Sequence, residues 1–242
     1  NHLSTAFVCG DRTGVILESE LDEDQTFRNA YEETKFQSEV AMRRAMEHLP
    51  IAVYRPSIVV GDSRTGEIDR MAGPYYLMQT IMQMPESIPA LRSVSGNAPL
   101  NMVPVDYVAR AMHRISLKDG VDGRTFHLTD SNPLAAKTVF ELVADHLGKT
   151  APVGRLPYRL AKILMRLPYV EKVTRNPRQF LDDFNQLTVF NAMNTDSAIG
   201  GEVRCPPFPS YAASLIDYLQ ENDLAEDLPV PSLEGILGAS RT

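Results

Sequence analysis

Residues 29–60 read NAYEETKFQSEVAMRRAMEHLPIAVYRPSIVV, and this stretch decides the fold. Apolar residues recur near helical spacing up to residue 49, helix-forming residues fill the intervals, and Pro50 ends the helix. The run 51–60 reads as a buried strand that its proline interrupts or ends. A short apolar run at 2–8, followed by Gly10, reads as an earlier buried strand. A helix between two such strands predicts a right-handed crossover and an α/β sheet.

Beyond this unit the chain continues as mixed helix and strand, and it becomes rich in helix and proline after residue 130. The predicted elements are a polar loop over 11–25, a helix over 74–84, a helix that begins near Asp106, a strand over 125–129 and a helix over 137–147 capped by Gly148.

Composition limits the classes of function. The chain has 242 residues, of which 43% are hydrophobic and 23% charged, as in an ordinary globular protein. Its net charge of -7 argues against a nucleic-acid partner, which requires concentrated Lys and Arg. The two cysteines and five histidines lack metal-ligand spacing, so no metal site is expected. The sequence also lacks a GxSxG elbow and a P-loop.

The sequence also indicates a compartment. No apolar run approaches the roughly 20 residues that span a bilayer, and there is no signal-peptide pattern, so we expect a cytoplasmic protein. The chain begins at Asn1, directly before a strand-like run, and we therefore expect an N-terminal portion of the same protein upstream.

Tyr31 and Lys35 are the candidate catalytic pair. Carbonyl reduction needs a proton donor near the carbonyl oxygen, and a tyrosine with a pKa near 10 serves only if its phenolate is stabilised. Four-residue spacing places Tyr31 and Lys35 on one face of a helix, with their Cβ atoms roughly 5–6 Å apart. The Lys35 ammonium could therefore stabilise the phenolate by direct electrostatics. A hydroxyl from the preceding strand, Thr5 or Ser4, would orient the carbonyl, and only one of the two can face the site. Tyr158 and Lys162 repeat the spacing without such a context.

Three motifs in order carry a family resemblance: Ser4-Thr-Ala-Phe-Val-Cys-Gly10 with Glu18 downstream, Asn29-Ala-Tyr-Glu-Glu-Thr-Lys35, and Arg55-Pro-Ser-Ile-Val-Val-Gly-Asp62. Together they resemble the extended short-chain dehydrogenases, and most of all the branch of fatty acyl-CoA reductases, male-sterility proteins and thioester reductases. The segments 103–111 and 205–211 are also similar to that branch. The resemblance implies a Rossmann-like, doubly wound parallel sheet with a smaller, mainly helical substrate domain.

The resemblance also implies residue roles. Tyr31 would be the acid-base residue, Lys35 its electrostatic partner and a ribose ligand, and Thr5 the hydroxyl that orients the substrate. Pro56, Ser57 and Ile58 would lie beside the nicotinamide of NADPH or NADH. Residues 1–62 and 101–130 would form a truncated catalytic part, and residues 63–100 and 131–242 the substrate-binding part.

The glycine-rich turn that holds the cofactor pyrophosphate in this family is absent from the sequence. We therefore expect the catalytic residues without the phosphate cradle, so the isolated chain need not be active. The implied reaction is the NAD(P)H-dependent reduction of a fatty acyl-CoA or a carrier-bound thioester to an aldehyde or alcohol. Two alternatives stay open: a nucleotide-sugar epimerase or dehydratase, and a non-catalytic substrate-recognition fragment.

The substrate partner would be acyl-CoA or an acyl-carrier protein. A basic amphipathic segment, with Arg155, Arg159, Lys162 and Arg166, reads first as a helix docked on the core with a solvated face. Its charge also suits an acidic carrier, coenzyme A phosphates or an anionic membrane surface without a membrane span.

Overall fold

The computed structural model describes residues 1–69, 73–83, 98–149 and 187–222. Its elements in chain order are β1 (His2–Leu3), η1 (Ala6–Cys9), β2 (Gly14–Ile16), α1 (Ala30–Ala45), β3 (Val53–Pro56), β4 (Ile58–Val60), α2 (Pro74–Gln83), β5 (Met102–Pro104), α3 (Val105–Ser116), β6 (Thr125–Leu128), α4 (Ala136–His146), β7 (Thr188–Phe190), α8 (Met193–Ile199), η3 (Phe208–Ser210) and α9 (Ala212–Glu221). The predicted α/β class is confirmed.

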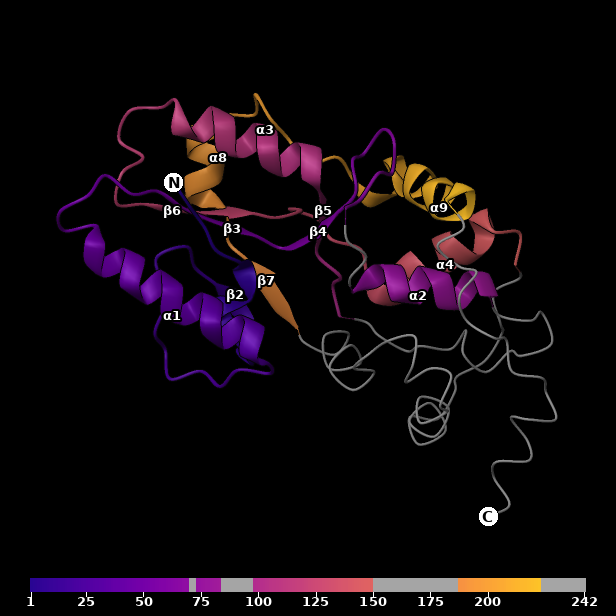
Figure 1. Cartoon of the computed structure of the whole chain (residues 1–242), viewed down its shortest axis with the longest axis horizontal. Coiled ribbons are helices and arrows are strands. Elements are labelled where there is room, and N and C mark those ends of the chain that lie inside the picture. Colours follow the sequence, from indigo (N-terminus) through magenta and orange to yellow (C-terminus); the bar gives the residue numbers. More distant parts are fainter. Residues whose placement is uncertain (70–72, 84–97, 150–186, 223–242) are drawn as a thin grey trace, which may run out of the picture.

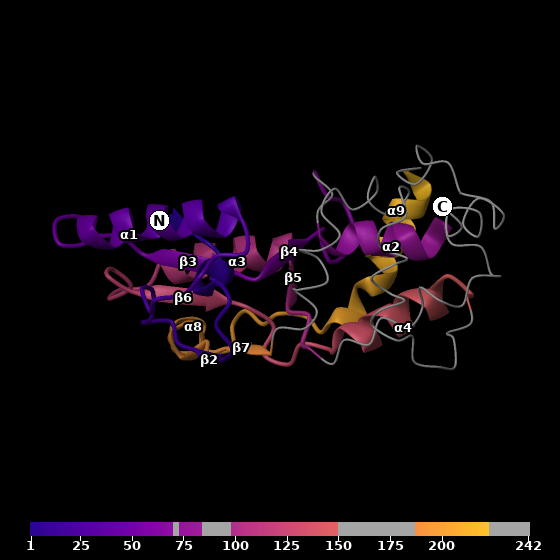
Figure 2. The ribbon, with the colours of Figure 1, turned by 90° about the horizontal axis from the view of Figure 1, so that it is seen from below.

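Among the described residues, the strands pair in parallel. The central sheet has the order β1-β3-β6, while β4 pairs with β5 and β2 pairs with β7. Helix α1 connects β1 to β3, and α3 connects β5 to β6. Figure 1 shows α3 on one side of these strands and α1 on the other, and the turned view in Figure 2 shows α1 lying along the sheet.

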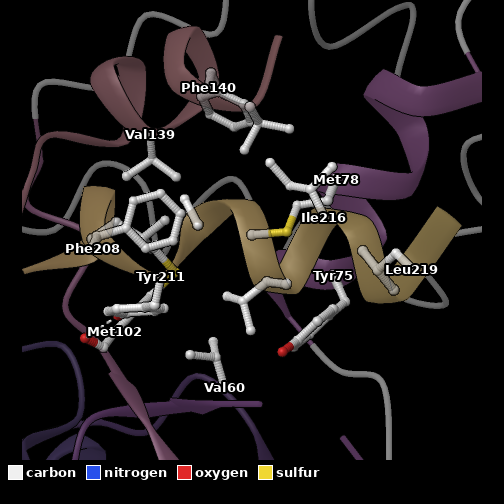
Figure 3. Close-up of a cluster of buried hydrophobic side chains, with 14 of the residues drawn as sticks. Val60, Tyr75, Met78, Met102, Val139, Phe140, Phe208, Tyr211, Ile216 and Leu219 are labelled. Atoms are coloured by element: carbon white, nitrogen blue, oxygen red, sulfur yellow. Dashed lines mark hydrogen bonds between the residues drawn. The ribbon is translucent and has the colours of Figure 1, made fainter. Parts of the chain in front are cut away.

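The described residues form two hydrophobic clusters. One packs α3 against the central sheet and includes Tyr54, Phe126 and Ile199 of α8. The other lies at the far end of the molecule, where α2, α4 and α9 pack around Tyr75, Met102 and Leu215 (Figure 3). The two clusters meet at the strand pair β4-β5, because Met102 contributes to the second and Val103 to the first.

The helix predictions agree closely with the structure. Asn29 caps α1 by accepting a hydrogen bond from Glu32 N, whereas the helix ends at Ala45, one turn earlier than the predicted end at residue 49. The other predicted helices correspond to α2, α3 and α4. Gly148 follows α4 with a φ of 66°, a conformation that favours glycine.

Two predictions are wrong. The strand expected over 2–8 ends at Leu3, because the Thr5 hydroxyl accepts a hydrogen bond from Phe7 N and starts the 3₁₀-helix η1 instead. The loop expected over 11–25 contains β2, which pairs with β7 from a distant part of the sequence. Met84, the basic segment with its Tyr158–Lys162 pair and the chain after residue 222 lie outside the described residues.

Candidate active site

Tyr31 and Thr5 come together where α1 begins. Tyr31 lies in the first turn of α1, and Thr5 has an extended backbone that continues β1. A side-chain hydrogen bond with Thr5 acts to lower the pKa of Tyr31. Partial burial is the larger cause and raises the pKa of Tyr31 above its ordinary value, with a further contribution from Glu32. The Tyr31 side chain is nevertheless 58% exposed, so a ligand could reach it.

The two neighbouring hydroxyls have different partners. The Thr5 hydroxyl lies 3.5 Å from the carbonyl oxygen of Pro56 and also hydrogen bonds with Tyr31. The Ser4 hydroxyl instead donates a 2.6 Å hydrogen bond to Glu39, inside the protein. The structure therefore brings Thr5, and not Ser4, to Tyr31.

Lys35 lies one helical turn after Tyr31. Its ammonium donates a 3.1 Å hydrogen bond to the carbonyl oxygen of Leu3, at the end of β1. The pKa of Tyr31 is set by burial, by Thr5 and by Glu32, and Lys35 is not among the groups that shift it. The two side chains lie on the same side of α1, and the Lys35 ammonium is hydrogen-bonded to the main-chain carbonyl of Leu3.

Pro56, Ser57 and Ile58 continue from the end of β3. Pro56 is buried, and its carbonyl group faces the Thr5 hydroxyl. Ile58 begins β4, and its amide donates to the carbonyl of Asn101. Ser57 is 5% exposed, and its hydroxyl is a buried polar atom without a hydrogen-bond partner. Ser57 directly follows Pro56, whose carbonyl faces Thr5, and a buried hydroxyl without a partner fits a ligand with an amide group, such as a nicotinamide carboxamide.

A buried ionic cluster beside this site was not predicted. Arg55 is 1% exposed, and its guanidinium forms hydrogen bonds of 2.7–3.2 Å with both oxygens of Glu39, itself fully buried. Burial alone would raise the pKa of Glu39, but the bonds and charge of Arg55 outweigh it and hold the pKa below its usual range. An arginine inside an otherwise apolar strand run is the signal that could have revealed this pair.

His127 continues the cluster on β6. Its Nδ1 lies 2.7 Å from the carbonyl oxygen of Asn191 and its Nε2 lies 3.3 Å from Arg55 Nη1. A carbonyl can only accept and a guanidinium can only donate, so His127 is neutral with its proton on Nδ1. Burial is the main cause that lowers the pKa of His127 to about 3, and the nearby Arg55 charge adds to it.

Glu18 connects the cluster to the C-terminal part of the chain. Its carboxylate accepts hydrogen bonds from the backbone amides of His127, Asn194 and Thr195. The last two amides belong to the first turn of α8, where a carboxylate satisfies unpaired donors. Burial raises the pKa of Glu18, although these hydrogen bonds act against the rise.

Acid should destabilise the fold through His127. The unfolded chain takes up a proton near the ordinary pKa of 6.5, whereas the folded protein resists protonation down to about 3. Because the unfolded state binds more protons in this window, the free energy of unfolding should fall as pH drops from 6.5, by up to about 1.4 kcal/mol per pH unit. Denaturant unfolding at a series of pH values measures this slope.

The variant His127→Asn isolates the contribution of His127 protonation to the pH dependence of the free energy of unfolding. Asparagine keeps an N–H for the Asn191 carbonyl but does not titrate. Glu18, with its raised pKa, stabilises the fold as pH falls, and this opposing effect is common to both proteins. The difference between the two stability curves should therefore slope with pH only below about 6.5, and a flat difference would contradict a neutral buried His127.

Within the described ranges, no helix is long and apolar enough to cross a membrane. The same ranges hold no group of three or more His, Cys, Asp or Glu side chains that could bind a metal ion.

Residues 1–112 match the model of a family described as male sterility protein, an NAD-binding family. Among curated proteins, aldehyde reductase lnbA of Aspergillus flavus is similar, at 25% identity over 155 residues. That alignment covers 62% of this chain but 14% of the fungal protein. The chain therefore spans a small part of the relative it matches.

Solved structures share the fold over nearly the whole chain. The terminal R domain of the myxalamid PKS-NRPS pathway matches 94% of this chain with a TM-score of 0.76 and 23% identity. A thiolation-reductase di-domain from an archaeal non-ribosomal peptide synthetase matches 93% with a TM-score of 0.68 and 17% identity. UDP-glucuronic acid 4-epimerase from Bacillus cereus also matches 93%, with a TM-score of 0.63 and 15% identity. The chain covers 59%, 49% and 61% of these structures.

Proposed function

We propose that the chain carries the acid-base site of an NADPH-dependent reductase of acyl thioesters, in keeping with the match of residues 1–112 to the family described as male sterility protein. The observation that carries the proposal is the hydrogen bond between Tyr31 and Thr5 at the exposed start of α1, with Lys35 one turn away. The similarity to a fungal aldehyde reductase and to a thiolation-reductase di-domain supports this substrate class over others.

The residues have distinct roles in this proposal. A bound nicotinamide would supply the hydride for the carbonyl carbon. The Tyr31 hydroxyl donates a proton to the oxyanion that forms, and the Thr5 hydroxyl hydrogen bonds to the same oxygen and orients it. The product of this addition is a hemithioacetal, whose C–S bond then breaks to release the aldehyde and the free thiol of the carrier or coenzyme A. The Lys35 ammonium stabilises the phenolate left on Tyr31 and would contact the cofactor ribose. Pro56, Ser57 and Ile58 would border the nicotinamide, and the buried Ser57 hydroxyl gives it a hydrogen-bond partner.

The substrate would be a fatty acyl-CoA or a carrier-bound thioester, in a cytoplasmic protein. We assign the acyl group to residues 63–100 and 131–242, whose described part contains the apolar cluster of α2, α4 and α9 (Figure 3). Catalysis would take place in residues 1–62 and 101–130. Strand β7 and helix α8 fall within residues 131–242, the range assigned to substrate binding. In the structure, however, they lie against β2, β6 and α3, next to the catalytic part.

The direct test follows NADPH consumption by the full-length protein with a series of acyl-CoAs and acyl-pantetheines. We expect consumption that depends on the thioester, with an aldehyde or alcohol product identified by mass spectrometry. The 242-residue chain alone, whose sequence has no glycine-rich turn, should bind NADPH weakly in a fluorescence titration. Tight binding by this chain would contradict the need for that turn.

The epimerase alternative is favoured by one observation, the fold shared with UDP-glucuronic acid 4-epimerase. It predicts conversion of a UDP-sugar without net NADPH consumption. A full-length protein that leaves every thioester unchanged and converts UDP-glucuronic acid would overturn the reductase proposal.

A further inference from the structure

We propose that Glu39 and Ser4 form a positioning device for the candidate active site: Glu39 holds the Ser4 hydroxyl, and this contact fixes the neighbouring Thr5 against Tyr31. The inference concerns two residues that do not reach the reacting atoms, and it rests on the roles proposed for Thr5 and Tyr31. Its basis is the set of contacts that one side of α1 makes with the chain around β1.

Four residues of α1, each four positions apart, form one stripe along the helix: Tyr31, Lys35, Glu39 and Arg43. All four contact the chain beneath the helix. Tyr31 hydrogen bonds with Thr5, Lys35 with the carbonyl of Leu3, and Glu39 with the hydroxyl of Ser4. Three consecutive residues, 3 to 5, are therefore each bound by a different turn of α1, which fixes the register between the helix and this segment.

Arg43 fixes the far end of the stripe. Its guanidinium donates to the carbonyls of Ser19 and Glu20 and to the hydroxyl of Thr125 on β6. The helix therefore cannot slide along the sheet without breaking these bonds as well, and the position of Tyr31 at the other end follows from them.

Ser4 links the buried ionic cluster to the candidate active site, because it binds Glu39 and directly precedes Thr5. Its amide donates to the carbonyl of Tyr54 on β3, and its hydroxyl donates to Glu39. Both ends of the residue are therefore bound, in a position only 3% exposed. Thr5 follows Ser4 directly and is equally buried, at 3% exposed, so holding Ser4 at both its amide and its hydroxyl fixes the backbone that carries the Thr5 side chain.

The Ser4 bond is not needed to satisfy the charge of Glu39. Arg55 already binds both carboxylate oxygens, and Arg43 donates a further bond of 3.2 Å. A buried ion pair is itself weak evidence for a stabilising role, since its desolvation opposes its attraction. What the Ser4 bond adds is a connection between this rigid pair and the segment that carries Thr5.

The variant Ser4→Ala tests the device in the full-length protein. We expect kcat to fall roughly ten- to a hundredfold, with the KM for NADPH nearly unchanged, because a small displacement of Thr5 misaligns the carbonyl oxygen. In a Thr5→Ala background the same substitution should have almost no further effect on kcat. Independent, multiplying effects of the two substitutions would overturn the proposal.

Thr195→Ala is the matched control. Thr195 is 2% exposed, and its hydroxyl lies 3.1 Å from the carboxylate of the buried Glu18 and 2.9 Å from the carbonyl oxygen of His127, so it is a buried hydroxyl beside a carboxylate, as Ser4 is beside Glu39. Both variants should therefore lose similar stability in denaturant unfolding, while only Ser4→Ala loses turnover. An equal loss of kcat in the two variants would assign Ser4 a merely structural role. If Ser4→Ala does not fold, Ser4→Cys, which keeps the volume and weakens the donor, is measured instead.

A second measurement does not depend on activity. The pKa of Tyr31 can be followed by NMR in the 242-residue chain with isotope-labelled tyrosine rings. Loss of the Thr5 hydrogen bond in Thr5→Ala should raise the pKa, because this bond acts to lower it. Ser4→Ala should raise it as well, and Thr195→Ala should leave it unchanged.

This titration separates the two proposals. An unchanged Tyr31 pKa in folded Ser4→Ala would overturn the positioning role, even if the full-length protein reduces thioesters. A raised pKa in a protein without reductase activity would support the device and reject the proposed function instead.

Discussion

Replacing Tyr31 with phenylalanine should lower the turnover of the full-length protein by about 10²- to 10⁴-fold, the range that a positioned general acid contributes. The substitution removes only the hydroxyl that would protonate the carbonyl oxygen, while Thr5 and the nicotinamide contacts remain. The ring is 58% exposed, so the loss of its hydroxyl should leave the free energy of unfolding nearly unchanged. Steady-state kinetics with NADPH and a thioester, next to denaturant unfolding, measures both quantities.

Tyr158→Phe is the control for this experiment, because Tyr158 belongs to the other tyrosine and lysine pair with the same spacing. Because Tyr158 lies in the part proposed to bind the substrate, its loss can change KM, but it should lower kcat far less than Tyr31→Phe does. The affinity for NADPH should also be similar in wild type and Tyr31→Phe, since most of the cofactor contacts lie elsewhere. Full turnover in Tyr31→Phe would remove this phenol from the mechanism.

Replacing Arg55 with methionine should destabilise the fold by about 3–5 kcal/mol, the cost of leaving one member of a buried ion pair without its partner. Methionine fills a similar volume, so the loss reports the charge and not a cavity. Glu39 would keep its bonds from Ser4 and Arg43 but lose the three bonds that Arg55 donates to its oxygens, and His127 would lose its donor. Denaturant unfolding at neutral pH measures the change.

Two further variants show whether the effect comes from the buried charge. Arg64→Met removes an arginine that is 79% exposed and paired with Asp62, and it should barely change the stability. The double variant Glu39→Met/Arg55→Met should recover much of the loss, because it removes the buried carboxylate together with Arg55, while Arg43 is 26% exposed and keeps its carbonyl acceptors. A double variant as unstable as the sum of the two single ones would show that charge is not the cause.

The sequence predicts the helices well because their signals are local. Asn29 marks the start of α1 and Gly148 the end of α4, each through the geometry of a few neighbouring residues, while Pro50 only limits α1, which already ends at Ala45. The strand β3 and the break after Pro56 are equally local, since proline cannot donate to the next ladder bond.

The two wrong predictions have different causes. Residues 6–9 are mostly buried, so their apolar character was visible, but a buried 3₁₀ turn and a buried strand look alike in a short apolar run. Strand β2 exists because β7 provides its partner, and the periodicity of three residues, Gly14 to Ile16, could not reveal that pairing.

The sequence located the candidate site only in part. Alternation along an extended segment predicted that one of Ser4 and Thr5 would reach Tyr31, and the hydrogen bonds show which one. The ionic cluster could not be predicted, because Glu39 lies in a helix rich in exposed charges and only tertiary contacts distinguish it. The catalytic roles of these residues stay predictions until the kinetic experiments are done.

The contacts of Glu18 also bear on how the protein is made. Its carboxylate binds amides 176 and 177 positions further along the chain, and β2 meets β7 at a similar separation. Contacts of such high sequence separation are slow to form. During synthesis the Glu18 carboxylate therefore stays hydrated, and these contacts cannot form until residue 195 has left the ribosome. A nascent chain halted before α8 should remain a target for chaperones, whatever the state of its central strands.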